Sequence, residues 1–263
     1  HRVLADVSTR KPVLILKGGY TKAGGEIAAS HTGSLTGEDM VYDAAFQRAG
    51  MVRVDEIADL FNAAEVLEMQ PLPHGPRLAI ITNAGGPGVM ATDALIGHGG
   101  KLANLSSKGM AELNRILPPY WSHGNPIDIL GDASAERYRQ AMDVCLDDEN
   151  VDGVLVIYTP RATADATGIA KGIVELCRAR GGLGKTIVTS FMGAEKVQEG
   201  NGIFTANGFP TYSTPEQAIT TYLYMNQYQH NLELLYETPE ELPVDSAPPR
   251  RPLQVTLQKA ARE

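Results

Sequence analysis

A lone histidine among small hydroxyl and glycine residues is the side chain of this protein best suited to nucleophilic chemistry. His31 lies in the run Ser30-His31-Thr32-Gly33, where small neighbours would let two other surfaces close on the imidazole. Ser30 and Thr32 can orient the ring or bind phosphate oxygens, and Gly33 permits a sharp turn. A neutral imidazole with a pKa near ~6.5 is a competent nucleophile at neutral pH. We expect no metal site, because no further ligand stands at metal-binding spacing; on spacing alone, an ordinary surface histidine remains the simpler interpretation.

A glycine turn between an apolar run and a helical pattern is the second candidate site. Residues 80–88 read IITNAGGPG, and Pro87 stands where a first helical residue is expected. The free N–H groups and the dipole of a helix that begins at such a turn favour anions. The turn has neither the dinucleotide fingerprint nor a P-loop lysine. A tight strand-to-helix connection without any ligand is the alternative.

A third polar segment, residues 121–128 (WSHGNPID), brings a histidine, an asparagine and an aspartate into one loop. No nucleophile stands near it at a defined spacing, so catalysis there is the weaker interpretation. We expect a structural turn at Asn125-Pro126, or residues that line a cleft.

Both main motifs lie in a chain that alternates apolar runs with helical patterns. From residue 77 onward the expected strands are 77–82, 101–105, 153–158, 186–191 and 210–212. The expected helices are 87–98, 106–116, 134–146, 164–180, 194–206 and 214–230. This alternation predicts an α/β fold, a flavodoxin-like doubly wound parallel sheet, over residues 77–235. Ligands should bind at the carboxyl ends of the strands.

The part before residue 71 is shorter and predicts only two strands. Residues 12–16 and 51–54 are strand candidates, and residues 38–49 and 55–69 are helix candidates, the second with Asp55 as its cap. Residues 17–37 predict a long loop with at most a helical turn near Ile27. We therefore predict the C-terminal part of a similar domain over 1–70, a proline-rich linker over 71–76, and a second linker over 236–263.

Composition excludes several classes of protein. A net charge of -8 argues against a nucleic-acid partner, because such proteins present a basic field. No apolar run is long enough for a membrane span, and no signal peptide opens the sequence. Cys145 and Cys177 fall in helical patterns and read as buried apolar residues, not as a disulfide framework. We expect a cytoplasmic protein, and the abrupt start predicts a fragment of a longer one.

In this order, the two motifs resemble NDP-forming acyl-CoA synthetases, a family related to succinyl-CoA synthetase. The resemblance is carried by residues 17–19 (KGG), 30–37 (SHTGSLTG), 44–46 (AAF), 82–88 (TNAGGPG) and 125–128 (NPID), and it covers nearly the whole chain. It implies that acyl-CoA, NDP and phosphate are interconverted with a carboxylate, CoA and NTP. His31 would be the catalytic nucleophile that carries the phosphoryl group on a mobile loop. The implied phosphate-binding residues are Ser30, Thr32, Gly33, Asn83, Gly85, Gly86 and Gly88.

The resemblance also implies partners that this sequence does not supply. The family adds a CoA-binding Rossmann domain and an ATP-grasp domain, so CoA, ATP or ADP and Mg²⁺ should be bound mainly outside this chain, which alone should be inactive. The family forms oligomers, so a homo- or hetero-oligomer is expected. Tyr20 stands where an arginine is common and Thr36 where an alanine is common, which puts the substrate pocket in doubt.

Two other functions stay open at this point. The second half also resembles the non-catalytic, synthetase-like sensing region of bacterial protein lysine acetyltransferases, notably at residues 212–216 (YSTPE). In those proteins the histidine is typically lost, whereas the His31 motif here is intact. A flavodoxin-like binding module is the third candidate, and it leaves the His31 motif unexplained.

Overall fold

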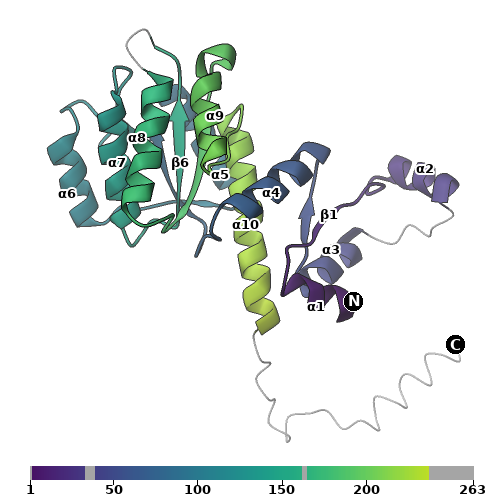
Figure 1. Cartoon of the computed structure of the whole chain (residues 1–263). Helices are drawn as coiled ribbons and strands as arrows, with labels where there is room; N and C mark the ends of the chain where they lie inside the picture. Colours follow the sequence, from purple (N-terminus) through teal and green to yellow (C-terminus); the bar gives the residue numbers. More distant parts are fainter. Residues whose placement is uncertain (1, 33–38, 162–164, 237–263) are drawn as a thin grey trace, which may run out of the picture.

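The computed structural model describes residues 2–32, 39–161 and 165–236, which form two parallel sheets linked through one long helix (Figure 1). We call residues 2–69 the first unit and residues 77–236 the second unit. The first unit contains α1 (Arg2–Ser8), β1 (Leu14–Leu16), α2 (Lys22–Thr32), α3 (Asp39–Arg48), β2 (Val52–Val54) and α4 (Ile57–Met69). Its two strands pair in parallel, with Leu14 opposite Val52.

The second unit has the strand order of a flavodoxin-like sheet. Its strands are β3 (Arg77–Thr82), β4 (Lys101–Leu102), β5 (Ile127–Asp128), β6 (Gly153–Tyr158) and β7 (Thr186–Phe191). The main path runs β4-β3-β6-β7, all parallel, and a bridge from Thr189 to Thr211 adds a fifth position at the edge. In chain order this is 2-1-3-4-5, the flavodoxin arrangement, whose topological switch point lies between β3 and β6. The short β5 pairs with the carboxyl end of β3.

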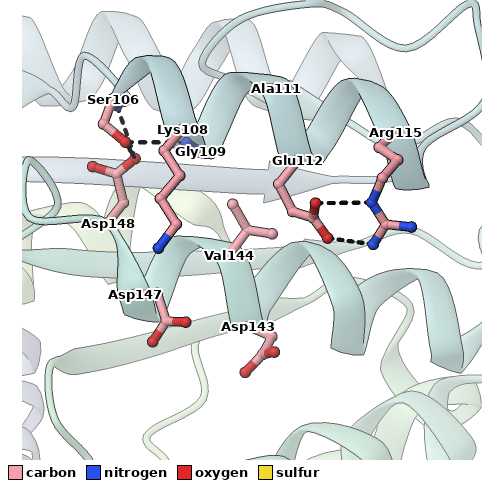
Figure 2. Close-up of a pocket in the computed structure, with 10 residues that line it drawn as sticks. All are labelled: Ser106, Lys108, Gly109, Ala111, Glu112, Arg115, Asp143, Val144, Asp147 and Asp148. Carbon is pink, nitrogen blue, oxygen red and sulfur yellow. Dashed lines mark hydrogen bonds and ion pairs between the residues drawn. The ribbon is translucent and has the colours of Figure 1, made fainter.

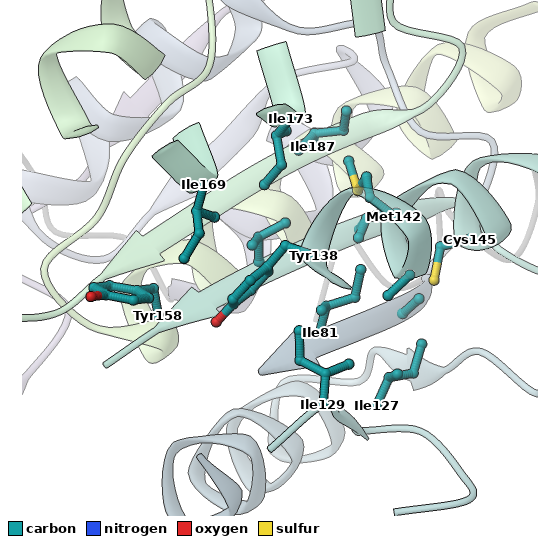
Figure 3. Close-up of a cluster of buried hydrophobic side chains, with 14 of the residues drawn as sticks. Ile81, Ile127, Ile129, Tyr138, Met142, Cys145, Tyr158, Ile169, Ile173 and Ile187 are labelled. Carbon is teal, nitrogen blue, oxygen red and sulfur yellow. The ribbon is translucent and has the colours of Figure 1, made fainter. Parts of the chain in front are cut away.

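Helices cover both faces of this sheet, as the prediction of a doubly wound fold requires. They are α5 (Gly85–Gly97), α6 (Ser107–Ile116), α7 (Ala135–Asp147), α8 (Ala166–Ala179), the 3-10 turn Ala194–Val197, α9 (Gln198–Ala206) and α10 (Pro215–Tyr236). Successive residues of a strand face opposite sides, so Ala79 and Ile81 join one core while Leu78 and Ile80 join the other. Figure 3 shows part of the first core, where Tyr138 of α7 lies among the surrounding isoleucines.

The helix α10 belongs to both units. Its upper half packs into the second core through Tyr222 and Met225, whereas Tyr228 packs against the first unit (Figure 1). The Tyr228 hydroxyl donates to the Ser8 carbonyl at 2.9 Å, and the Asn231 amide donates to the Met51 carbonyl at 2.8 Å. The same helix therefore contributes to a hydrophobic core of the second unit and to that of the first unit.

The segment between the units is packed more closely than a free linker would be. The Gln70 side chain donates to the Gly208 carbonyl and accepts from the Ile187 N–H. The Thr186 hydroxyl donates to the Pro71 carbonyl at 2.7 Å. The start of the predicted linker therefore lies against the edge strand of the second sheet.

Several sequence predictions need correction. Residues 22–32 form α2, so the prediction of a loop was wrong there; the many small residues of this segment hide the helical period. The helix α5 begins at Gly85, two residues early, so Pro87 is its third residue and not its first. Glu56, not Asp55, caps α4, through a reciprocal capping box with Asp59. Helix α1 and strand β5 were not predicted, and the strand predicted at 210–212 is reduced to a single bridge.

The prediction for the two cysteines is confirmed. Cys145 and Cys177 are free and buried, and burial raises the pKa of the Cys145 thiol to about 12 and that of Cys177 to about 11. Both thiols therefore stay protonated at neutral pH. Within the part of the chain that the structure describes, no helix has the combined length and apolar character needed to cross a membrane.

Candidate functional site

His31 lies in the last turn of α2, on the chain between β1 and α3. Its neighbour Ser30 donates its hydroxyl hydrogen to the Ile27 carbonyl at 2.7 Å, so this hydroxyl acts within the helix itself. Gly33, predicted to bind phosphate, lies outside the described residues, as do residues 34–38. The structure therefore places the backbone of the His31 motif at the end of a helix that follows the carboxyl edge of β1.

The predicted glycine turn lies at the switch point of the second sheet, where β3 and β6 end. Asn83 follows β3 and is only 1% exposed. Its side chain donates to the Thr159 carbonyl at 2.9 Å and accepts from the Thr159 N–H at 2.8 Å. The amide that we predicted to contact phosphate is therefore directed at the neighbouring strand end, where it holds the two loops together.

The first residues of α5 divide into open and packed positions. Gly85 and Gly86 are exposed and occupy the first two helical positions, where N–H groups have no partner within the helix. A Cβ built on Gly86 meets no atom within 4 Å. Gly88 is buried, and a Cβ there would lie 3.2 Å from Thr82 and 3.3 Å from Pro126. A side chain at Gly88 would therefore press on Thr82 and Pro126, and the Gly88 N–H falls within the helical hydrogen-bond pattern.

Two charged residues lie at the same edge: Asp128, from the polar segment 121–128, and Arg161, which the sequence analysis did not single out. The Asp128 carboxylate accepts from the Leu130 N–H at 3.0 Å, and its other oxygen is 3.2 Å from the Cβ position of Gly85. The exposed Arg161 follows β6, and its Nε is 3.5 Å from the Cβ position of Gly131. No carboxylate among the described residues pairs with the Arg161 guanidinium. The position of Arg161 just after a buried strand was the signal that could have revealed it.

The structure does not bring the two predicted motifs together. Figure 1 shows α2 at the far side of the first unit, with β1, α4 and α10 between it and the second sheet. The α5 N-terminus lies on the second sheet, beside β3. Within this chain the His31 motif and the α5 turn are therefore two separate places.

Other polar groups of the described chain do not form a catalytic centre. The ring nitrogens of His123 contact the Asn114 side chain at 2.8 Å and the Pro119 carbonyl at 2.9 Å, which fits the predicted structural role of this loop. No group of three or more potential metal ligands occurs in residues 2–32, 39–161 and 165–236. The Asn125 side chain bridges the Ile80 N–H, at 2.9 Å, and the carbonyls of Leu78 and Ala103.

A groove of about 490 Å³ lies between α6 and α7, away from both motifs (Figure 2). Asp148 accepts from the N–H and the hydroxyl of Ser106, both at 2.8 Å, and Arg115 pairs with Glu112. These contacts cap α6 and stabilise its exposed surface. None of them activates a nucleophile, so the groove is not the candidate active site.

Comparison with known proteins assigns both units. Residues 1–67 match the model of the succinyl-CoA ligase like flavodoxin domain, and residues 78–231 match the model of the Ligase-CoA domain. The chain belongs to the NDP-forming acyl-CoA synthetase family. It is 39% identical over 227 residues to an ADP-forming acetate–CoA ligase of Archaeoglobus fulgidus, covering 86% of this chain and 32% of that one.

A subunit and a solved structure support the same family. The α subunit of ADP-forming acetate–CoA ligase II of Pyrococcus furiosus is 38% identical over 222 residues, covering 81% of this chain and 47% of the subunit. A dinucleotide-forming acetyl-coenzyme A synthetase of Candidatus Korarchaeum cryptofilum, solved with phosphate and ADP, superposes with a TM-score of 0.82 at 32% identity. The superposition covers 89% of this chain and 50% of that one. The chain thus spans between a third and a half of the length of these relatives.

Proposed function

We propose that this chain is the part of an acyl-CoA synthetase that carries a phosphoryl group on His31 between an acyl phosphate and a nucleoside diphosphate. The observation that supports this most directly is that this member of the family contains both motifs. It combines the His31 motif on α2 with a helix, α5, whose first two residues, Gly85 and Gly86, are exposed at a sheet switch point.

In the proposed chemistry His31 is the nucleophile in one step and the leaving group in the next. Phosphate first attacks acyl-CoA and releases CoA, which leaves an acyl phosphate. A neutral His31 nitrogen then attacks phosphorus, the P–O bond to the acyl group breaks, and the carboxylate leaves. In the last step an NDP oxygen attacks the same phosphorus, the P–N bond breaks, and neutral imidazole is restored. Each step needs positioning and compensation of negative charge.

The α5 turn is our candidate for one of the two places where the phosphoryl group is held. The N–H groups of Gly85 and Gly86 and the positive end of the helix dipole favour an anion there. Arg161 adds positive charge at this edge, while Asp128 opposes it on the Gly85 side. Asn83 acts by positioning the turn through Thr159, and Gly88 acts by letting α5 pack closely.

The proposed cycle requires partners for this chain. His31 and the α5 turn are separate, so His31 must either be carried to that turn or meet it on a second copy. CoA, the nucleotide and Mg²⁺ are expected to bind mainly to the other domains or subunits of the enzyme, in line with the matched relative that is itself a subunit. CoA and nucleoside phosphates are used in the cytoplasm, where we place the protein.

The test is His31→Ala in the intact synthetase. We expect acyl-CoA formation from carboxylate, CoA and NTP to fall to the level of the enzyme-free reaction, because the motif offers no other nucleophile. The matched control is His230→Ala, since His230 is an exposed histidine of α10 whose nearest acidic group, on Glu233, is 3.9 Å away. Circular dichroism should show both variants folded.

A folded His31→Ala enzyme with near-normal turnover would overturn the proposal. It would favour the sensing region of an acetyltransferase, in which the histidine is not needed. Sequencing the gene on both sides of this chain would distinguish the two: an encoded ATP-grasp domain would favour the ligase, and an encoded acetyltransferase domain the alternative.

A further inference from the structure

A network of charged residues connects the two ends of the segment that carries His31. Lys17 Nζ lies 2.8 Å from Asp39 Oδ1, and an Arg53 nitrogen lies 2.7 Å from Asp39 Oδ2 and 2.5 Å from Asp43 Oδ1. We call Lys17, Asp39, Asp43 and Arg53 the base cluster. Hydrogen bonds from Lys17 and Arg53 lower the pKa of Asp39, and those with Asp39 and Asp43 raise the pKa of Arg53. These hydrogen bonds therefore favour the charged forms of Asp39 and Arg53.

The strand register explains why two cations meet at this place. Ile15 of β1 pairs with Arg53 of β2, so their side chains face the same side of the sheet. Lys17 follows Ile15 by two residues and projects to that side as well. The opposite side carries Leu14, Val52 and Val54, which pack against α4 and α10.

Helix α3 meets this sheet through charged side chains. It contains no buried residue, whereas Asp39 and Asp43 lie one turn apart and thus on one face. That face meets Lys17 and Arg53, whose side chains are each only 17% exposed. The Tyr42 ring lies 4.6 Å from the Lys17 ammonium and shields it further. Partly buried charge pairs of this kind are screened less by salt than exposed pairs.

The position of the base cluster in the chain gives it a functional meaning. Lys17 directly follows β1 and comes before α2, and Asp39 is the first residue of α3, after α2. Their ion pair therefore ties together the two ends of the segment that contains α2 and His31. Arg53 joins this tie to β2, which is anchored in the hydrophobic core of the first unit.

The cluster is not arranged as a binding site for a free ion. Both Asp39 oxygens are already engaged by different cations, and Arg53 is shared between two carboxylates. The space beside it, about 360 Å³, is also lined by Tyr20, Val54 and Asp55, so positive and negative charge nearly balance there. Such a balanced cluster fixes chain geometry and attracts neither phosphate nor a metal ion strongly.

We infer that the base cluster is a positioning clamp that sets where α2 presents His31 during phosphoryl transfer. This inference rests on the proposed function. The clamp holds the residues just before and just after the α2 segment together at the edge of the β1–β2 sheet. This fixed attachment limits the positions that His31 can reach. Lys17 and Asp39 are positioning residues, since they act on the reaction through the placement of His31.

The experiment measures labelling of His31 in the intact synthetase under single-turnover conditions, from γ-labelled NTP and, in the other direction, from acyl-CoA with labelled phosphate. Lys17→Met keeps the length of the side chain but removes its charge. It should slow labelling about tenfold or more in both directions, since a displaced reacting group costs that much. The KM for NTP should change by less than about twofold, because nucleotide binds elsewhere.

Two further variants make the test specific. Lys17→Arg restores the charge and should recover labelling to within about threefold of the unmodified enzyme. Arg10→Gln breaks an ion pair with Asp6 on α1, where both side chains are more than half exposed, and should leave the rate unchanged. Asp43→Asn retains the Lys17–Asp39 pair and should slow labelling by a smaller factor than Lys17→Met, which keeps the test valid if Lys17→Met does not fold.

The outcomes separate the clamp from the proposed function. Normal labelling in folded Lys17→Met, failure of Lys17→Arg to recover it, or normal labelling in Asp43→Asn would overturn the clamp while leaving His31 as the phosphoryl carrier. An unmodified enzyme whose His31 never acquires label would overturn the proposed function and the clamp together.

Discussion

The two units of this chain are built by different forces. The second unit buries both faces of a parallel sheet between helices, with β3, β6 and β7 almost wholly inside. The first unit has two short strands, and only one of their faces packs on an apolar core. Its other face meets α3 through the base cluster. The unit that carries His31 is thus held in part by directional charge pairs, and the unit with the α5 turn by hydrophobic burial.

This difference suits the tasks that we propose for the units. Close packing gives the α5 turn a fixed geometry, because interiors at crystal-like density resist deformation. Elements with few buried contacts open at lower free energy than core elements do. The segment that carries His31 has few buried contacts, and the base cluster attaches it to the β1–β2 sheet. The comparison predicts that substitutions in the hydrophobic core of the second unit lower stability, whereas substitutions at the base cluster or at the α5 turn mainly change phosphoryl transfer.

The largest effect on stability is expected at Phe204. Its side chain is completely buried, with its ring centroid 4.9 Å from that of Phe191 and 5.7 Å from that of Phe209. Phe204→Ala should lower the free energy of unfolding by about 3–5 kcal/mol, measured by urea denaturation. Phe61 of α4 is 69% exposed, and Phe61→Ala should change it by less than about 0.5 kcal/mol. Equal losses in both variants would contradict the contrast between the units.

A smaller effect is expected at the junction of the units. Tyr228→Phe removes the buried hydrogen bond to the Ser8 carbonyl and should cost about 1–2 kcal/mol. Hydrogen exchange should then quicken in α1 and β2 but not in β6. Tyr236→Phe, at an exposed position of the same helix, is the matched control and should alter neither. Faster exchange throughout the second unit would show that α10 does not divide the molecule in this way.

The smallest effect on stability, with the opposite sign, is expected at Gly86. The position is helical and open, so Gly86→Glu should fit and raise stability by about 1 kcal/mol through helix propensity and the helix dipole. The added carboxylate should nevertheless slow phosphorylation of His31 about tenfold or more by repelling the phosphoryl group. Gly86→Ala should gain the propensity and keep the rate. If Gly86→Glu and Gly86→Ala label His31 equally fast, the anion site lies elsewhere.

The sequence predicted the buried strands best. The ranges 77–82, 153–158 and 186–191 agree with β3, β6 and β7, because strands buried on both faces leave continuous apolar runs. Edge strands gave weaker signals, so 101–105 and 210–212 were predicted too long. Helix α2 was missed because its composition of glycine, alanine and serine resembles that of a loop; α2 exposes even Ile27.

For the α5 turn, the sequence predicted the secondary structure but not the side-chain contacts. The strand, the glycine turn and the helix start at residues 83–88 were predicted from the sequence, and anion binding there stays a prediction. The division of labour among Asn83, Gly86 and Gly88 depends on Thr159 and Pro126, which only the tertiary structure brings close. In the base cluster, Lys17 and Arg53 both pair with Asp39. They meet there because β1 and β2 pair in a register that could not be predicted from the sequence.

The most direct test of the central claim is the chemistry of the label on the intact enzyme. Incubation with γ-labelled NTP and Mg²⁺ should place label on His31, and this label should be lost in acid and kept in base, because phosphoramidates hydrolyse in acid whereas phosphoserine survives it. Peptide mapping should locate the label on residue 31. A label that survives acid, or that maps to Ser30 or Thr32, would contradict the assignment of His31 as the phosphoryl carrier.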